Sequence, residues 1–224
     1  MFTKATLKFL DELAANNNRA WFEANKPRYE ALVREPALDF IEAMAPVLES
    51  FAPHFRADLR KVGGSLMRVF RDTRFARDKT PYKTNIGIQL RHELGKDVHA
   101  PGFYVHIACD ECFLGVGCWH PDALSLGRIR DFIAQKPERW FSARDGADFV
   151  AQWALAGDSL TRPPRGYAAD HPAAEDLKRK DFLGLSALSL TEVTSPQFVE
   201  LAGKRFAAAA PFMKLLCEAV EVQY

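Results

Sequence analysis

Residues 103–119, with the sequence FYVHIACDECFLGVGCW, decide the fold of this chain. From 103 to 108 apolar and more polar side chains alternate, which is the period of a strand with one buried face. A second strand is expected over 113–119, where Gly115 and Gly117 share a face. The link between the two is short, so we predict an antiparallel hairpin.

Further strands are predicted on both sides of this hairpin. Ile86, Ile88 and Leu90 alternate with small or polar residues, which indicates another half-buried strand. Residues 65–70 (SLMRVF) form a candidate strand before it, and residues 182–190 form one much later in the chain. Because the central strands follow one another without a helix between them, we expect an antiparallel sheet of about five strands rather than a doubly wound parallel one.

The two ends of the chain are predicted to be helical. Apolar positions recur with a helical period between about residues 3 and 51, with Thr3 and Asn18 as expected N-caps. A helical and loop-rich region is expected at about 121–222. Its final helix is predicted to start at Ser195, as N-cap, and to bend at Pro211.

These elements predict one α+β domain over residues 1–224. The N-terminal helices occupy about 3–51, the sheet and a basic loop about 62–120, and the remaining helices about 121–222. Helices from both termini are expected to pack against the mostly antiparallel sheet. We find no internal repeat and no linker long enough to separate two domains.

Composition narrows the classes of function. The chain has 224 residues, 48% of them hydrophobic, and a formal net charge of +1, which argues against generic coating of nucleic acid. No apolar run approaches the ~18 residues of a membrane-spanning helix. We therefore expect a cytoplasmic protein without a membrane partner, whose four cysteines are reduced.

The charge is concentrated in Arg68–Thr84, which reads RVFRDTRFARDKTPYKT. Six basic and two acidic residues give this segment a net charge of +4 in a chain whose total is +1. Arginine forks suit bidentate recognition of phosphate or carboxylate. Two other interpretations remain open: Asp72 and Asp78 pair with the arginines in a purely structural network, or the segment is a protein-contact patch.

The same segment resembles a known family. Arg71–Thr84 matches the pattern Arg-Asp-x-Arg-Phe-x-x-Asp-Lys-x-Pro-Tyr-Lys-Thr of the family called domain of unknown function 2461. Shorter stretches at 17–22, 115–121, 164–167 and 170–172 are also similar to that family, and at 101–104 the chain has Pro-Gly-Phe-Tyr where Ala-Gly-Tyr-Tyr is more usual. The resemblance covers nearly the whole chain. It implies a single intracellular domain and assigns no activity.

Two other motifs contain residue types that occur in redox, metal or acid/base sites. Cys109 and Cys112 form a C-x-x-C, but a hairpin turn does not lower thiol pKa values as a helix N-terminus does, and we expect ordinary thiols and no metal. His120 and His171 each precede a proline at a loop-to-helix boundary. Paired with Asp122 and Asp170 respectively, either is a candidate acid/base group, although capping or packing is the commoner role.

The main functional hypothesis is a site for a small phosphorylated or carboxylated ligand at the Arg71–Lys83 loop, walled by aromatic side chains and completed by a second basic loop around residue 165. The predicted ligand-binding residues are Arg68, Arg71, Arg74, Asp78, Lys79, Tyr82, Lys83, Tyr104, Trp119, His120, Arg165 and Tyr167. The alternative is a nucleic-acid or protein interaction module, in which Phe70, Phe75 and Tyr82 stack against bases. No cofactor is expected, and catalysis and oligomeric state stay open.

Overall fold

The computed structural model describes residues 1–95 and 100–224. Within those residues six strands form one antiparallel sheet with the order β1-β2-β3-β4-β6-β5. The strands are β1 (Phe55–Arg56), β2 (Ile86–His92), β3 (Gly102–Ile107), β4 (Cys112–Cys118), β5 (Ala154–Ala156) and β6 (Phe182–Ala187). The predicted α+β class and the antiparallel sheet are confirmed.

The central hairpin forms as its alternation predicts. Phe103 faces Val116 and Val105 faces Leu114 across β3 and β4, and all four side chains are fully or almost fully buried. The turn closes with a hydrogen bond of 3.0 Å from the Ala108 N–H to the Glu111 carbonyl. One face of the hairpin therefore belongs to the core, and the residues of opposite parity lie on the other face.

The edges of the sheet differ from the prediction. Residues 65–70 do not form a regular strand, because they meet β2 and its preceding loop only through the isolated bridges Leu66–Ile88 and Phe70–Tyr82. The short strands β1 and β5 have too few residues to show an alternating pattern. The strand β6 ends at Ala187, because Ser189 caps the short helix α8 (Leu190–Val193) with a capping box.

The N-terminal helices follow their predicted capping signals. Thr3 caps α1 (Lys4–Ala15), and Asn18 caps α2 (Arg19–Tyr29). A π-helical turn, η1 (Glu30–Arg34), joins α2 to α3 (Glu35–Glu49), so the chain remains helical through this region.

The second half of the chain is mostly helical. Its helices are α4 (Ala123–Gln135), α5 (Pro137–Arg144), α6 (Ala147–Val150), α7 (Ala174–Leu177), α8, α9 (Phe198–Ala208) and α10 (Ala210–Ala219). The final helix starts at Phe198 rather than just after Ser195, whose hydroxyl instead accepts a hydrogen bond from the Gln197 N–H. At Pro211 the predicted bend is a break between α9 and α10, because proline lacks the N–H that would continue the helical ladder.

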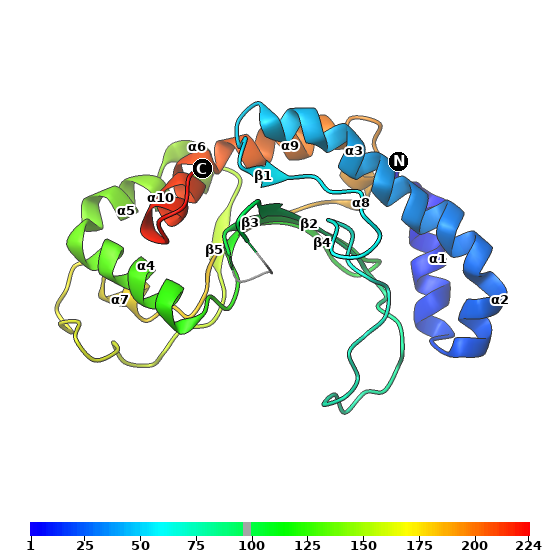
Figure 1. The fold of residues 1–224 in the computed structure, drawn as a ribbon, viewed down its shortest axis with the longest axis horizontal. Coiled ribbons are helices and arrows are strands. Elements are labelled where there is room, and N and C mark those ends of the chain that lie inside the picture. The colour runs from blue at the N-terminus through cyan, green and yellow to red at the C-terminus, as the bar shows by residue number, and fades with distance from the viewer. Residues whose placement is uncertain (96–99) are drawn as a thin grey trace.

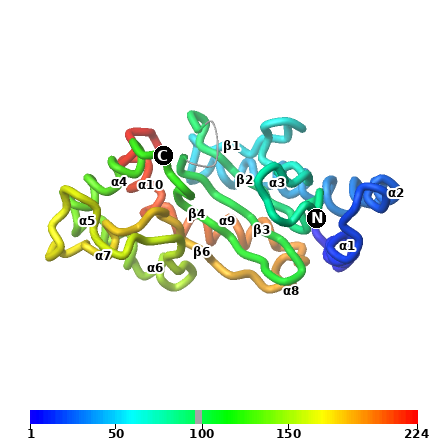
Figure 2. Tube along the Cα trace, turned by 90° about the horizontal axis from the view of Figure 1, so that it is seen from below, coloured from blue at the N-terminus to red at the C-terminus, as the bar shows by residue number. Residues whose placement is uncertain are grey.

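Helices cover one face of the sheet. Figure 1 shows a curved sheet with α3 and α9 across its convex side, α1 and α2 at one end, and α4, α5 and α10 at the other. Seen from below, β3, β4 and β6 lie in front of α9 with no helix across them (Figure 2). The Phe103 ring joins the layers, with its centroid 4.9 Å from that of Phe55 and 5.0 Å from that of Phe206. The opposite, concave face of the sheet is not covered by these helices.

Candidate functional site

The concave face of the sheet holds a hollow of about 530 Å³. Its walls come from β2, β3, β4 and β6, and from the segments that precede β2 and follow β4. The larger apolar and aromatic side chains that line it are Met67, Tyr104, Phe113, Trp119, Leu183 and Leu185. Except for Met67, which lies outside the regular strands, these are positions of opposite parity to the buried core residues, so the pleat of the strands directs them to this face.

Glycines make the floor of the hollow. A Cβ at Gly115 would lie 3.5 Å from the Tyr104 Cβ and 3.6 Å from the Leu185 Cδ2, which are ordinary contacts. A Cβ at Gly87 would come 2.8 Å from the Tyr104 hydroxyl oxygen, so the phenol ring lies over that glycine. The missing side chain at Gly115 of β4 thus adds depth to the hollow, whereas the Tyr104 ring covers Gly87 of β2.

Polar groups gather at one end of the hollow. The His106 Nδ1 atom lies 3.3 Å from the Tyr104 hydroxyl oxygen and 3.5 Å from the Asn85 amide nitrogen. Because an amide nitrogen only donates, Nδ1 accepts and the neutral ring carries its proton on Nε2. Burial lowers the pKa of His106 and raises the pKa of Tyr104 to about 12, so both side chains are neutral near pH 7.

Lys83 lines the same end of the hollow. Its backbone N–H donates to the Val69 carbonyl at 2.7 Å, which fixes the chain where the basic segment meets β2. Burial of the ammonium group lowers the pKa of Lys83, and the nearby Arg68 charge lowers it further. None of the described residues that line the hollow is an aspartate or a glutamate.

Arg71, Arg74 and Lys79 bond within their own loop. Arg71 binds Asp78 and Thr80, and the Arg74 Nη2 atom lies 2.7 Å from the Asp72 carboxylate. The Lys79 Nζ atom donates to the Thr73 carbonyl at 2.8 Å. The arginine hydrogen bonds hold the pKa of Asp72 and of Asp78 at about 2. Here the structural network foreseen from the sequence is present, in a loop that hangs below the sheet in Figure 1.

Tyr82 lies away from the hollow. Its ring is 2% exposed and stacks on the Phe22 ring of α2 at a centroid distance of 4.0 Å. The Asn17 side chain accepts from the Tyr82 N–H at 3.0 Å and donates to the Tyr82 carbonyl at 2.9 Å. Tyr82 therefore anchors the base of the loop to the N-terminal helices and does not join the aromatic wall.

Trp119 and His120 follow the last residue of β4. Trp119 is half exposed at the rim of the hollow, and its ring stacks on the His120 ring at 4.4 Å. The carboxylate partner of His120 is Asp181, with Nδ1 and Oδ1 2.8 Å apart. The predicted partner, Asp122, caps α4 by accepting from the backbone N–H groups of Leu124 and Ser125. His120 and Asp181 are 61 positions apart in the sequence, so no local sequence pattern predicts the pair.

The structure does not bring the second basic loop to the first. The Tyr167 hydroxyl donates to Asp131 of α4 at 2.8 Å, and burial raises its pKa to about 12. Arg165, two residues earlier, is exposed. In Figures 1 and 2 the loop around residue 165, drawn in yellow, lies across the sheet from the loop over residues 71–81.

His171 is a structural residue. Its Nε2 atom lies 3.1 Å from the Ala134 carbonyl, and its Nδ1 atom accepts from the Ala173 N–H at 3.0 Å. Both ring nitrogens are therefore occupied, and the imidazole ties the start of α7 to α4.

The C-x-x-C motif holds two separate thiols. Cys109 is exposed and donates to the Leu7 carbonyl at 3.0 Å, whereas Cys112 is buried. Burial raises the pKa of both thiols, which opposes thiolate chemistry. Across residues 1–95 and 100–224, no cluster of three or more histidine, cysteine or acidic side chains is arranged to hold a metal ion.

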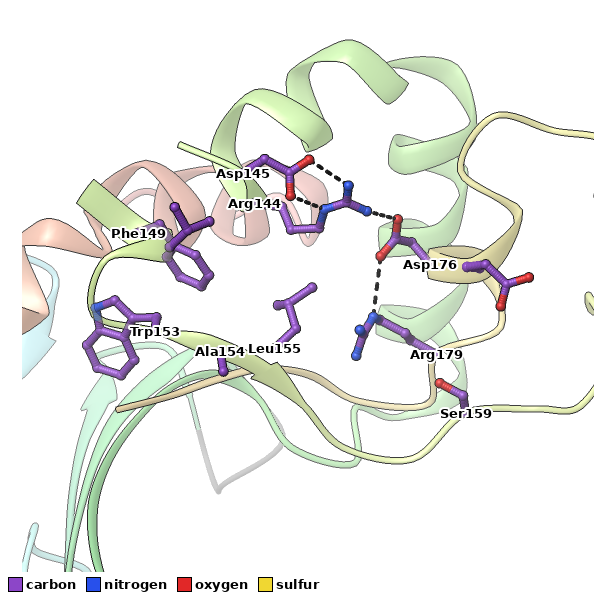
Figure 3. Close-up of a pocket in the computed structure, with 11 residues that line it drawn as sticks. Arg144, Asp145, Phe149, Trp153, Ala154, Leu155, Ser159, Asp176 and Arg179 are labelled. Carbon is purple, nitrogen blue, oxygen red and sulfur yellow. Dashed lines mark hydrogen bonds and ion pairs between the residues drawn. The ribbon is translucent and has the colours of Figure 1, made fainter. Parts of the chain in front are cut away.

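A second hollow, of about 510 Å³, lies between α5, β5 and α7 (Figure 3). Sequence reasoning missed it, because its residues are scattered from Arg144 to Arg179. The Arg144 side chain bonds Asp145 and Asp176, and the Arg179 Nε atom lies 3.3 Å from the same Asp176. Both arginines of this hollow already pair with carboxylates. The hollow is therefore less suited to binding an anionic ligand than the hollow on the concave face.

Comparison with known proteins places the chain in a family. Residues 5–215 match the profile of a family described as "Conserved hypothetical protein (DUF2461)". The chain belongs to the DUF2461 family. No curated protein and no solved structure matched it. Among the described residues of this DUF2461 member, no helix is both long and apolar enough to cross a membrane.

Proposed function

We propose that this DUF2461 protein binds a small ligand in the hollow on the concave face of its sheet, and that the ligand carries an anionic group that pairs with Lys83. The observation that carries the proposal is a partly buried lysine in a largely apolar hollow whose described lining has no carboxylate. The volume of about 530 Å³ is within the usual range of ligand sites, roughly 300–1,000 Å³.

Electrostatics favours Lys83 over the loop arginines as the anion-binding group. Arg71 and Arg74 would have to give up Asp78 and Asp72 to bind a ligand, whereas Lys83 has no ion pair in the described part of the chain. A bound anion would offset the desolvation of the Lys83 ammonium group and raise its pKa again. The anion site predicted for the whole Arg71–Lys83 loop is therefore proposed at its C-terminal end.

The body of the ligand is proposed to be flat and partly apolar. Phe113, Leu183 and Leu185 stand beside the glycine floor, and Trp119 forms one rim. Asn85 and Gln89 add amide groups that can orient a polar edge of the ligand. Aromatic side chains and a few polar groups in one hollow are the usual composition of a small-molecule site.

A thermal-shift screen tests the proposal. The panel contains phosphate, nucleotides, sugar phosphates, dicarboxylates and aromatic carboxylates. Each compound has an anionic group, and the compounds differ in the rest of the molecule. A ligand at about 100 times its dissociation constant adds about 2.7 kcal/mol to the free energy of unfolding. We expect a selective rise in Tm that Lys83→Met removes and the control Lys79→Met retains. No rise across the panel, or a rise unchanged in Lys83→Met, contradicts the proposal.

One observation favours the alternative function. Phe75 is 95% exposed in the basic loop, and the Arg74 guanidinium lies 5.9 Å from its ring centroid. An exposed ring beside cations is suited to stacking on single-stranded nucleic acid. Under this alternative, Phe75→Ser and Arg77→Ala weaken salt-dependent binding of short oligonucleotides. Flat binding isotherms for DNA and RNA at low salt would remove it.

We also propose a cytoplasmic location. The four cysteines are free thiols in the structure, as is usual in a reducing compartment. Cell fractionation against a cytoplasmic marker protein tests this location, and recovery in the membrane or secreted fraction contradicts it.

A further inference from the structure

The ends of β4 and β6 bring a histidine and a buried carboxylate together. Cys118 pairs with Phe182 in the sheet; Asp181 is one residue and His120 two residues beyond that pair, and the two lie beside each other. Asp181 is 1% exposed, while the His120 side chain is about half exposed. The carboxylate is therefore part of the interior, and the imidazole is accessible.

Asp181 fixes the backbone of His120 as well as its ring. His120 has a φ of 47°, in the left-handed region that residues other than glycine seldom adopt. The His120 N–H donates to the Asp181 Oδ1 atom at 2.7 Å, and the Asp158 N–H donates to Oδ2 at 2.9 Å. Unusual backbone geometry held by the surrounding structure is commonest at functional sites.

The closeness of the His120 ring to Asp181 indicates where the ring proton resides. The Nδ1 atom lies 2.8 Å from the Asp181 Oδ1 atom, and a carboxylate favours a protonated nitrogen beside it, so the neutral ring is favoured with its proton on Nδ1 and its lone pair on Nε2. Within the described ranges, Nε2 of His120 takes part in no hydrogen bond, whereas both ring nitrogens of His171 do. A buried carboxylate that orients an accessible imidazole is the arrangement of a general base.

The pair adjoins the hollow. Trp119, which stacks on His120, lines the hollow together with Gly117 and Leu183. Lys83 and Asn85 lie at the opposite end, near the start of β2. Along β3 the two ends are separated by the five residue steps from Ile107 to Gly102. At ~3.4 Å per residue that distance is about 17 Å, so a ligand that reaches both ends is elongated.

We propose that His120 is a general base, and Asp181 its positioning residue, for proton transfer on an elongated anionic ligand bound in the hollow. The His120 Nε2 atom takes a proton from a ligand hydroxyl group or a water molecule at the Trp119 end. The Asp181 carboxylate stabilises the resulting imidazolium. The electron pair of the broken O–H bond stays on that oxygen, which bonds to the ligand as a leaving group departs. The leaving group takes the proton from the imidazolium, and the histidine returns to its neutral form. This inference rests on the proposed function, because the substrate is the ligand of the hollow.

The test is carbethoxylation of the native full chain with diethyl pyrocarbonate, followed by peptide mass mapping. The imidazole nitrogen attacks one carbonyl carbon of the reagent, and ethyl carbonate leaves and decomposes to ethanol and carbon dioxide. We expect His120 to react at least about tenfold faster than His171, because its Nε2 lone pair is available. Equal rates for the two histidines overturn the proposal.

The role of Asp181 needs a separate comparison. In Asp181→Asn, provided that circular dichroism and Tm show a folded protein, labelling of His120 is expected to slow by at least about tenfold, while labelling of His54 is unchanged. His54 is the matched control, because its Nδ1 atom pairs with Glu93 at 2.6 Å outside the hollow. Unchanged labelling of His120 contradicts the positioning role. If Asp181→Asn does not fold, the comparison of His120 with His171 in the wild-type chain decides.

A protection experiment separates this inference from the proposed function. The probe is the compound that gives the largest Tm rise in the anion panel, at a saturating concentration. It is expected to slow labelling of His120 but not of His54. A compound that binds through Lys83 and leaves His120 unprotected overturns the proton-transfer role while the binding proposal stands. If no compound binds, the proposed function is contradicted, and the proton-transfer role of His120 then has no substrate.

Discussion

Burial of the Lys83 ammonium group lowers its pKa, and the Arg68 charge adds to the effect. A basic group whose pKa is lower in the folded chain than in the unfolded one destabilises the fold at pH values where the unfolded chain holds the proton. That destabilisation is absent above the unfolded pKa and develops as pH falls through it. Lys83 thus lowers stability at neutral pH, which is expected of a residue that serves a ligand.

A neutral residue at position 83 should stabilise the ligand-free protein. Lys83→Met keeps the length of the side chain and removes the desolvated charge, so we expect a gain of up to about 1 kcal/mol, or roughly 2–4 °C in Tm. Thermal unfolding at pH 7 measures it, with Lys79→Met as the exposed control. A lower Tm for Lys83→Met would mean that the ammonium group makes a stabilising interaction in the free protein.

The 71–81 loop should loosen in acid. The Arg71 and Thr80 hydrogen bonds hold the pKa of Asp78 at about 2, below its unfolded value of about 3.9. Their contribution is complete above pH 4 and is lost as pH falls towards 2. Hydrogen exchange of the Thr80 N–H, which donates to Asp78 Oδ1 at 2.9 Å, should accelerate in that window beyond its intrinsic pH dependence. Asp78→Asn should not show that extra acceleration, and equal responses in the two proteins would refute the assignment.

At the scale of elements, the regular pieces of the sheet were predictable and its edges were not. The alternation around Ile86 and Phe103 specifies which face of a strand is buried, so β2, β3 and β4 are visible in the sequence. Residues 65–70 have strand-like composition but make only isolated bridges, because position relative to β2 decides pairing at an edge. The sequence also shows that Gly115 and Gly117 of β4 share a face, but it does not show that they line the bottom of a hollow.

Filling the floor of the hollow should remove ligand binding without unfolding the chain. In Gly115→Leu the new Cβ meets Tyr104 and Leu185 at ordinary contact distances, and the rest of the side chain enters the hollow. We expect the ligand-dependent Tm rise to vanish. The control is Gly127→Ala in α4, where the added Cβ meets nothing within 4 Å. It should retain binding and gain about 0.5–1 kcal/mol of stability. Retained binding in Gly115→Leu would place the ligand elsewhere.

At the scale of the whole molecule, the site is assembled by contacts that no short pattern encodes. Lys83 belongs to the segment singled out by its charge, and Tyr104 and Trp119 were predicted site residues; all three line the hollow. Tyr82, Arg165 and Tyr167 lie elsewhere, because Asn17 and Asp131, both distant in sequence, hold the two tyrosines. Asp181 was missed because its partner is across the sheet. The concentration of charge and the buried face of each strand could be predicted from the sequence. The residues that meet from distant parts of the chain could not.

The one-sided sheet gives a comparison between two phenylalanines of the same hairpin. Phe103 is fully buried among rings from α9 and the chain before β2, so Phe103→Ala should destabilise the protein by about 3–5 kcal/mol. Phe113 is only partly buried on the concave face, and Phe113→Ala should cost about 1 kcal/mol while weakening ligand binding. Urea denaturation measures both. Similar losses would show that the concave face carries as much of the fold's stability as the convex one.

The brevity of the outer strands affects how copies of this chain meet. A strand from another molecule can extend a sheet only where several consecutive N–H and C=O groups are free. The outer strands offer two residues in β1 and three in β5, and residues 65–67 occupy part of the remaining edge of β2. Such edges have few free backbone groups with which another strand could pair, and fibrils grow by the addition of strands in this way. The protein can therefore leave a wide apolar face open while its sheet resists polymerisation.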